Sequence, residues 1–174
     1  TARRGPRCHC RTGDGKTAVR AARTPDLLMN NSAAKDGGIF MTIALIAHDA
    51  KKELMVQFCM AYCHILEQHR LLATGTTGRL VEENAGLKVT KFLPGGHGGA
   101  EQIVARIACE EVDMLLFFRD PISAKPNEPN EMNLLRICDV HNIPVATNIA
   151  TAEVLIHGLE HGDLDWRTII NPQH

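Results

Sequence analysis

The chain has 174 residues, 44% of them hydrophobic, which is enough for one domain with a sizeable core but not for two ordinary domains. Its net charge of −1 excludes the class of proteins that neutralise nucleic-acid phosphates with a basic surplus. No apolar run reaches the roughly 18 residues that a membrane span requires, so we expect a soluble protein without a membrane partner.

The chain contains six cysteines, and their distribution bears on the compartment. Cys59, Cys63, Cys109 and Cys138 stand singly in apolar segments, which predicts that they are small buried hydrophobic residues. This pattern favours a reducing compartment over a disulfide scaffold, so the sequence predicts a cytoplasmic protein.

Residues 1–40 differ from the rest of the chain. Arginines are spread through this segment with few carboxylates and no helical or strand period, which predicts disorder. Met41 directly precedes the first predicted strand, so we place the folded domain at residues 41–174. We interpret residues 1–40 as a leader, a cloning remnant or upstream read-through, with an Arg-rich targeting peptide as the alternative. The run Cys8–Cys10 lacks the spacing of a zinc site, so no metal is expected there.

From Met41 onwards, apolar strand-like runs alternate with segments in which apolar residues recur at helical spacing. The predicted strands are 42–47, 70–73, 89–93, 112–118 and 143–146, and the predicted helices are 51–65, from about 76, about 102–109, 131–140 and 151–157. The run 112–118, apolar except for Asp113, is typical of a central parallel strand buried on both faces. The pattern predicts one doubly wound, Rossmann-like α/β domain with a five-stranded, mainly parallel sheet.

Thr74–Thr77, called the threonine turn below, falls where a predicted strand ends and a helix begins. Such a junction offers free backbone N–H groups, a favourable helix dipole and hydroxyl donors, so it suits a phosphate group. A simple helix cap would have the same composition. The number of similar loops at the other strand ends favours the phosphate site.

Polar or glycine-rich residues follow each of the other predicted strands. Because the carboxyl ends of parallel strands meet at one edge, these loops are expected to share a ligand site. Together they offer hydroxyls and amides for a phosphate, carboxylates that can move a proton, and a histidine that can polarise a carbonyl oxygen. This set suits proton abstraction beside a carbonyl in a small phosphate ester. The loops are His48-Asp49, Pro94–Gly99 (the glycine loop), Arg119-Asp120-Pro121 and Thr147-Asn148.

Four motifs resemble those of the methylglyoxal synthase family: Ile43–Asp49, Ala73–Gly78, Phe117–Pro121 and Asn142–Asn148. They occur in order over Met41 to about Leu159, at the intervals expected of that family. The resemblance implies a carbon–oxygen lyase that takes dihydroxyacetone phosphate to an enediolate and then eliminates phosphate to give methylglyoxal. It also implies a homohexamer, inhibition by inorganic phosphate, and no metal or organic cofactor.

The resemblance also implies roles for particular residues. His48 would polarise the substrate carbonyl, held by Asp49, and Asp120 would be one of the active-site carboxylates. Asn127 replaces a substrate-binding histidine of the family and stays a candidate binding residue. The substrate and phosphate site would be lined by Lys52, Thr74, Gly75, Thr76, Thr77 and Gly95.

The chain departs from the family pattern in the same loops. The third-strand loop of the family usually reads Ser-Gly-Pro-x-Gly-Gly-Asp-Gln-Gln, with the aspartate as catalytic base. Here Ala100 occupies the base position, and Pro94 replaces a phosphate-contacting serine. Glu101 or another retained carboxylate would then take the proton. A second loop, Pro126–Asn130, loses the histidine and a further carboxylate of the family pattern.

Two functions therefore stay open from the sequence. The first is a methylglyoxal synthase with impaired activity, which the retained His48, Asp49, Asp120 and threonine turn favour. The second is a non-catalytic module of the same fold that binds a phosphorylated effector, which Ala100 and Pro94 favour. A nucleotide-binding role ranks third, because the glycine loop matches neither a P-loop nor a dinucleotide fingerprint.

Overall fold

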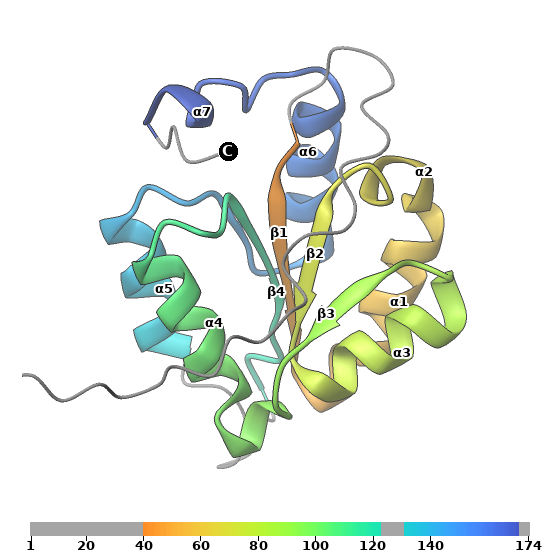
Figure 1. Ribbon diagram of the computed structural model, residues 1–174. Coiled ribbons are helices and arrows are strands. Elements are labelled where there is room, and N and C mark those ends of the chain that lie inside the picture. Colours follow the sequence, from red (N-terminus) through yellow and green to blue (C-terminus); the bar gives the residue numbers. More distant parts are fainter. Residues whose placement is uncertain (1–39, 123–130, 171–174) are drawn as a thin grey trace, which may run out of the picture. The chain divides into compact units, whose positions relative to one another are not determined.

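The computed structural model describes residues 40–122 and 131–170, which belong to a unit spanning 35–174 (Figure 1). The strands in this part of the chain are β1 Thr42–Ala47, β2 Arg70–Ala73, β3 Val89–Lys91, β4 Met114–Phe118 and β5 Val145–Ala146. The α-helices are α1 Lys52–Ala61, α2 Cys63–Leu66, α3 Gly75–Ala85, α4 Gly99–Ala108, α5 Glu131–Val140, α6 Ile149–Glu160 and α7 Arg167–Ile170, and two 3-10 turns are η1 Asp49–Lys51 and η2 Gly95–His97.

The five described strands form one sheet in the order β3-β2-β1-β4-β5, and every neighbouring pair is parallel. β1 lies at the centre, where Ala44 pairs with Leu72 of β2 and with Leu115 of β4. The chain builds outward from β1 to β3, and α4 then returns it to β4 on the other side of β1. The predicted doubly wound α/β fold is confirmed. Its switch point, where ligands bind in such sheets, lies between β1 and β4.

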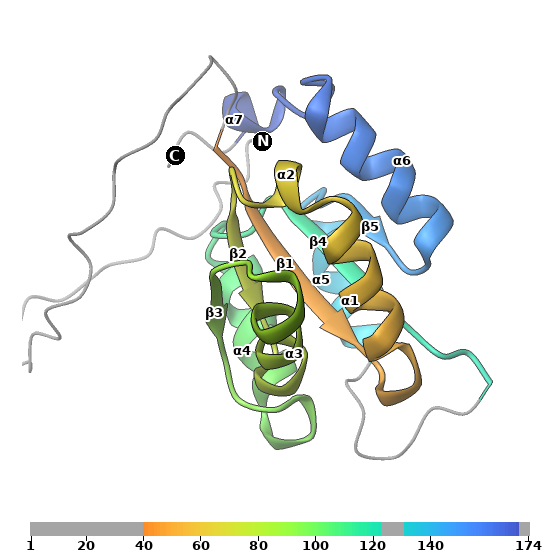
Figure 2. The same ribbon diagram turned by 90° about the vertical axis from the view of Figure 1, so that its right-hand side faces the viewer.

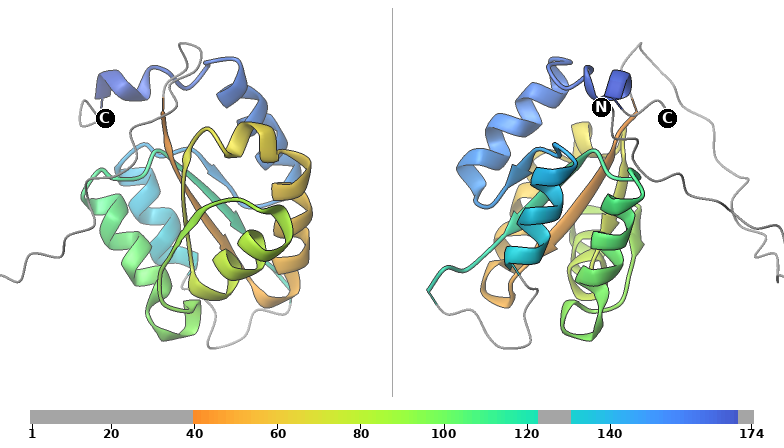
Figure 3. Two further views of the ribbon diagram at one scale, coloured as in Figure 1. Left: turned by 45° about the vertical axis from the view of Figure 1, so that its right-hand side comes forward. Right: turned by 90° about the vertical axis from the view of Figure 1, so that its left-hand side faces the viewer.

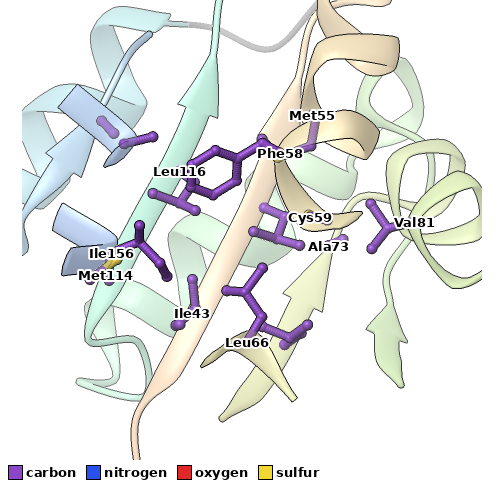
Figure 4. Packing of buried hydrophobic residues seen from close by; sticks show 14 of the residues in the cluster. Ile43, Met55, Phe58, Cys59, Leu66, Ala73, Val81, Met114, Leu116 and Ile156 are labelled. Carbon is purple, nitrogen blue, oxygen red and sulfur yellow. The ribbon is translucent and has the colours of Figure 1, made fainter. Parts of the chain in front are cut away.

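Side chains of β1 alternate between two hydrophobic cores, as the period of a strand requires. Ile43 and Leu45 pack with residues of α1, α2, α3 and α6, while Ala44 and Ile46 pack with residues of α4 and α5. Figure 3 shows these two helix layers from either side of the sheet. Figure 4 shows the first core, which includes Phe58 of α1 and Leu116 of β4.

Several element boundaries differ from those predicted, for local reasons. β5 is confined to Val145–Ala146 because Pro144 has no N–H to donate to the sheet, although its carbonyl accepts from Leu115. The predicted helix 51–65 is divided into α1 and α2 at Tyr62, whose φ of −109° and ψ of 23° are not helical. Helix α4 begins three residues before the prediction, at Gly99, after Gly98 turns the chain with a φ of 92°.

The prediction for the cysteines is only partly correct. Cys59 and Cys138 are buried, and burial raises the pKa of each thiol to about 12, so both stay protonated. Cys63 is half-buried, but Cys109 is exposed, which corrects the prediction. Cys109 follows the last residue of α4 and so lies beyond the apolar face that Ile103 and Ile107 bury. Among the described residues, none of the helices has the length and apolar character to cross a membrane.

Candidate active site

At the carboxyl edge of the sheet, to which the β1 arrow points in Figure 2, hydrogen bonds between loops join β1 with β4, β4 with β5 and β2 with β3. The parallel pairing of β1 with β2 places both groups of loops at this edge. The predicted loops therefore do meet at one edge. The backbone bonds, donor first, are His48 to Phe118 (3.0 Å), Arg119 to Thr147 (3.4 Å), Phe92 to Ala73 (2.8 Å) and Gly75 to Leu93 (3.0 Å).

His48 follows β1 directly and is 1% exposed. Its ring lies edge-on to Phe117 of β4, with the ring centroids 5.2 Å apart. The backbone N–H of Asp120 donates to His48 Nδ1 at 3.0 Å. Because Nδ1 accepts this bond, the neutral imidazole carries its proton on Nε2. The β4 loop thus fixes both the ring orientation and the tautomer, and leaves Nε2–H as a donor group suited to a carbonyl oxygen.

Asp49 begins the 3-10 turn η1 after His48, and Lys52 is the first residue of α1. Lys52 Nζ contacts Asp49 Oδ1 at 2.5 Å, and the side chains are 20% and 52% exposed respectively. The ion pair is too exposed to contribute much stability. It keeps an ammonium group at the N-terminal end of α1, where a phosphate would also benefit from the helix dipole.

The threonine turn forms the N-terminus of α3, with Thr74 as the N-cap residue. Thr74 donates its hydroxyl to Thr77 Oγ1 at 3.2 Å, and both hydroxyls are buried. The Thr76 side chain is only half-buried. Within the first turn, Gly75 N–H donates to Leu93 and Gly78 N–H to Thr74, while the N–H groups of Thr76 and Thr77 lie where a helix offers no partner of its own. This arrangement can bind an anion through backbone amides and the Thr76 hydroxyl.

The glycine loop packs against both neighbouring helix starts. A Cβ atom at Gly75 would lie 2.7 Å from the Phe92 carbonyl oxygen, and one at Gly99 would lie 1.8 Å from the Leu93 carbonyl oxygen. Both distances are far below van der Waals contact, so only glycine fits at these two positions. The close approach brings Gly95 to the same edge as the threonine turn.

The first turn of α4 contains Ala100, which stands where the family has its catalytic aspartate. Ala100 is 4% exposed and faces inward, whereas Glu101 is exposed. One residue along a helix rotates the side chain by about 100°, which accounts for the difference. Among the described residues, no hydrogen bond or ion pair joins Glu101 to the other candidate residues.

Asp120 lies at the switch point and is half-buried. Its Oδ1 accepts the Ile122 N–H at 3.1 Å, in addition to the bond of its own N–H to His48. The structure therefore brings His48 and Asp120 into direct contact, and joins Asp49 to Lys52 and Thr74 to Thr77. Asn127, the other candidate, lies outside the described residues, as do residues 1–39 with the Cys8–Cys10 run.

Sequence reasoning did not find three features of this edge. The partner of His48 is a backbone N–H, which no side-chain pattern reveals. The Phe117 ring reads only as one more apolar strand residue. Gln102 of α4, whose Oε1 accepts the Leu93 N–H at 2.9 Å, was part of the loop motif without a role. Within residues 40–122 and 131–170, no three His, Cys, Asp or Glu side chains gather as metal ligands.

The chain is similar to known proteins over its α/β domain. The family model described as the MGS-like domain matches residues 54–147, which include the threonine turn, the glycine loop and Asp120. A methylglyoxal synthase from Caldicellulosiruptor saccharolyticus is 62% identical over 133 residues, covering 76% of this chain and 94% of that protein. One from Oceanobacillus iheyensis is 58% identical over 130 residues, covering 75% of this chain and 93% of that protein.

Solved structures give the same relationship. The crystal structure of methylglyoxal synthase from Elizabethkingia anophelis superposes with a TM-score of 0.66 at 39% identity, covering 67% of this chain and 77% of that one. The matching family model spans more than half of the chain, and the first relatives are matched over nearly their whole length. The chain therefore belongs to the methylglyoxal synthase family.

Proposed function

We propose that this protein is a methylglyoxal synthase that converts dihydroxyacetone phosphate to methylglyoxal and inorganic phosphate. A base removes a proton from the hydroxyl-bearing carbon beside the carbonyl, which gives an enediolate. The enediolate then expels phosphate from the other carbon as the C–O bond breaks, and the resulting enol tautomerises to methylglyoxal. The observation that carries the proposal is the buried His48 ring, held with Nε2–H as its donor at the switch point of the sheet, in a chain 62% identical over 133 residues to a named synthase.

In this mechanism, His48 Nε2–H donates to the carbonyl oxygen while that oxygen gains negative charge. A donor held in place before the reaction stabilises that charge without reorganisation. The phosphate group lies at the threonine turn, bound by the first amides of α3, the Thr76 hydroxyl and Lys52 Nζ, with Gly95 closing the site. Neutral imidazole suits this role because it stabilises the enediolate without fully protonating it.

The retained carboxylates differ in position, and this difference supports a choice of proton acceptor. Asp120 comes first, because its peptide contacts the His48 ring and its side chain is half-buried. Glu101 must bend back from an exposed position, and Asp49 is paired with Lys52. We infer that Asp120 takes the proton slowly in place of the absent aspartate, and that Glu101 and Asp49 contribute less.

A second candidate function is a module that binds a phosphorylated effector without turning it over. It is favoured by Ala100, a buried methyl group at the inward-facing position where the family has its base. Both functions use the same anion site and differ only in the proton transfer.

The resemblance to the family also supports proposals about assembly and location. We propose that the protein works as a homohexamer in the cytoplasm and that inorganic phosphate inhibits it by occupying the threonine turn. Light scattering coupled to size-exclusion chromatography tests the assembly, and competition by phosphate in the activity assay tests the inhibition.

One experiment separates the two functions. Purified protein is mixed with dihydroxyacetone phosphate, and methylglyoxal and phosphate release are followed together, with Asp120→Asn and Glu101→Gln as parallel variants. The proposal is supported if the parent releases methylglyoxal and phosphate in equal amounts and Asp120→Asn abolishes this release. Tight phosphate binding with no release favours the effector module. Repeating the assay without residues 1–40 tests whether that segment is dispensable for activity.

A further inference from the structure

The backbone of one residue, Leu93, contacts both helix starts of the proposed site. Its carbonyl oxygen accepts the Gly75 N–H of α3 at 3.0 Å, and its N–H donates to Gln102 Oε1 of α4 at 2.9 Å. Leu93 is the residue immediately before the glycine loop. The conformation of the Leu93 backbone therefore sets where the glycine loop leaves β3 and how the loop lies against α3.

The next residue makes the Gln102 contact more important. Pro94 has no N–H, so it cannot donate a bond that would fix the start of the loop. Its carbonyl accepts from His97 and Gly99 at 2.8 and 3.1 Å, and both bonds stay inside the loop. The bond from Leu93 N–H to the Gln102 side chain is thus the donor contact that ties the start of the loop to the body of α4.

The glycines at this junction leave little space for adjustment. The Leu93 carbonyl carbon would lie 3.3 Å from a Cβ atom at Gly75 and 2.7 Å from one at Gly99. The Leu93 backbone is thus held between two helix backbones at close contact, and a change in its dihedral angles would displace Gly75 or Gly99. Gly75 begins the threonine turn, and Gly99 precedes the position of the missing base.

We propose that Gln102 is a positioning residue for the phosphate site. Its side-chain oxygen holds the Leu93 N–H, and through the Leu93 backbone it keeps the glycine loop and the first turn of α4 in place beside the threonine turn. This inference rests on the proposed function for its link to catalysis, but the contact itself can be tested without activity.

The test compares two variants at one position. Gln102→Met keeps the length of the side chain and removes the acceptor, whereas Gln102→Glu keeps an oxygen at the same reach. Gln68→Met is the matched control, because the Gln68 amide makes a similar exposed bond, to the His64 carbonyl at 2.9 Å, before β2 at the other end of the sheet. Backbone amide exchange at Leu93, Gly75 and Gly99 is measured by NMR, along with phosphate affinity and kcat/KM.

Loss of one hydrogen bond of this kind typically changes an equilibrium constant by about threefold to tenfold. We expect Gln102→Met to speed exchange at Leu93 and to lower phosphate affinity and kcat/KM by that factor. Gln102→Glu should restore the exchange rates, and Gln68→Met should change none of these quantities. Unchanged exchange in Gln102→Met, or equal losses in the Met and Glu variants, overturns the proposal. If the parent releases no methylglyoxal, the proposed function fails, and the exchange pattern still decides the role of Gln102.

Discussion

The two ends of the sheet both carry buried polar groups, but they use them differently. At the amino end, Asp113 is 2% exposed, accepts the Thr42 N–H at 2.8 Å and faces Arg167 Nε at 3.7 Å. Arg167 in turn donates to the Asn142 carbonyl at 2.5 Å. These contacts join β1, β4, α7 and the turn before β5. At the carboxyl end, one nitrogen of His48 is held by a backbone N–H, and two helix N-termini face the same edge.

The more deeply buried polar groups are not those at the proposed site. Asp113 and Arg167 are more buried than Asp49 or Asp120, yet their contacts are directed at each other and at the backbone. The carboxyl edge instead presents donors that one small anion could bind together. We therefore expect substitutions at the amino end to change stability, and substitutions at the carboxyl end to change ligand binding and turnover.

The largest effect is expected at the amino end. Asp113→Ala leaves the buried Arg167 guanidinium without its carboxylate, and breaking such a pair typically costs about 3 to 5 kcal/mol. Urea unfolding should show a loss of this size, with phosphate affinity unchanged in the folded protein. Adding Arg167→Leu should recover part of the loss, because no buried charge is then left unpaired. A loss below about 1 kcal/mol would show that the pair acts like a surface ion pair.

His48→Gln should give the converse result. Removing a preorganised donor to a developing oxyanion typically lowers kcat by about 10²- to 10³-fold. Phosphate affinity should change much less, because the anion lies at the threonine turn, and the melting temperature should stay near that of the parent. Normal kinetics in a protein of reduced thermal stability would instead make His48 a purely structural residue and remove the contrast between the two ends.

Much of the fold could be predicted because its strands are nearly pure apolar runs. The run 112–118, apolar except for Asp113, predicted a strand buried on both faces, and the structure places β4 within it. The amino-end cluster could not be predicted, since Asp113 and Arg167 are 54 positions apart and no pattern links them. At the carboxyl end, the strand-end rule found His48, Asp120 and the threonine turn. The contacts between them depend on backbone groups, which have no sequence signature.

Restoring the aspartate that the family has at position 100 should increase the catalytic rate of the site at the carboxyl end. Ala100→Asp should raise kcat by at least about tenfold, since general-base assistance is typically worth 10²- to 10⁴-fold. Because Ala100 is buried, the carboxylate will also lose some hydration, so a lower free energy of unfolding is expected. Ala100→Asn is the matched control, with similar volume and no base. Equal rates in the Asp and Asn variants would contradict this assignment of the position.

Smaller effects are expected from removing hydroxyl groups of the threonine turn, and they should differ between the half-buried Thr76 and the buried Thr77. Thr76→Ala removes a half-buried donor to the anion, so phosphate affinity by calorimetry should fall about tenfold. Thr77→Ala removes a buried hydroxyl that accepts from Thr74, so it should lower stability as well as affinity. Thr76→Ser is the control that keeps the hydroxyl. If neither alanine variant changes the affinity, these residues are helix caps and the anion binds elsewhere.

The smallest expected effect concerns pH and returns to the amino end. Burial lowers the pKa of His69, and the nearby Asp113 only partly opposes this shift. His69 Nδ1 accepts the Met41 N–H at 3.4 Å, which also requires an unprotonated nitrogen. The unfolded chain therefore binds a proton more readily than the folded chain below about pH 6.5. The stability contributed by neutral His69 is complete above that pH and is lost as the pH falls towards the lowered folded pKa.

His69→Gln keeps a possible acceptor for the Met41 N–H but cannot titrate. Chemical unfolding at pH 7 and pH 5 should therefore show a smaller loss of stability in His69→Gln than in the parent, by less than about 1 kcal/mol because the imidazole is only partly buried. His64→Gln, which replaces an exposed histidine nearby in sequence, is measured alongside as the control. Asp113→Ala should enlarge the His69 effect, because the carboxylate that favours the protonated ring is gone. Identical pH dependence in the parent and His69→Gln would show that the folded and unfolded chains protonate this ring alike, and would contradict this prediction.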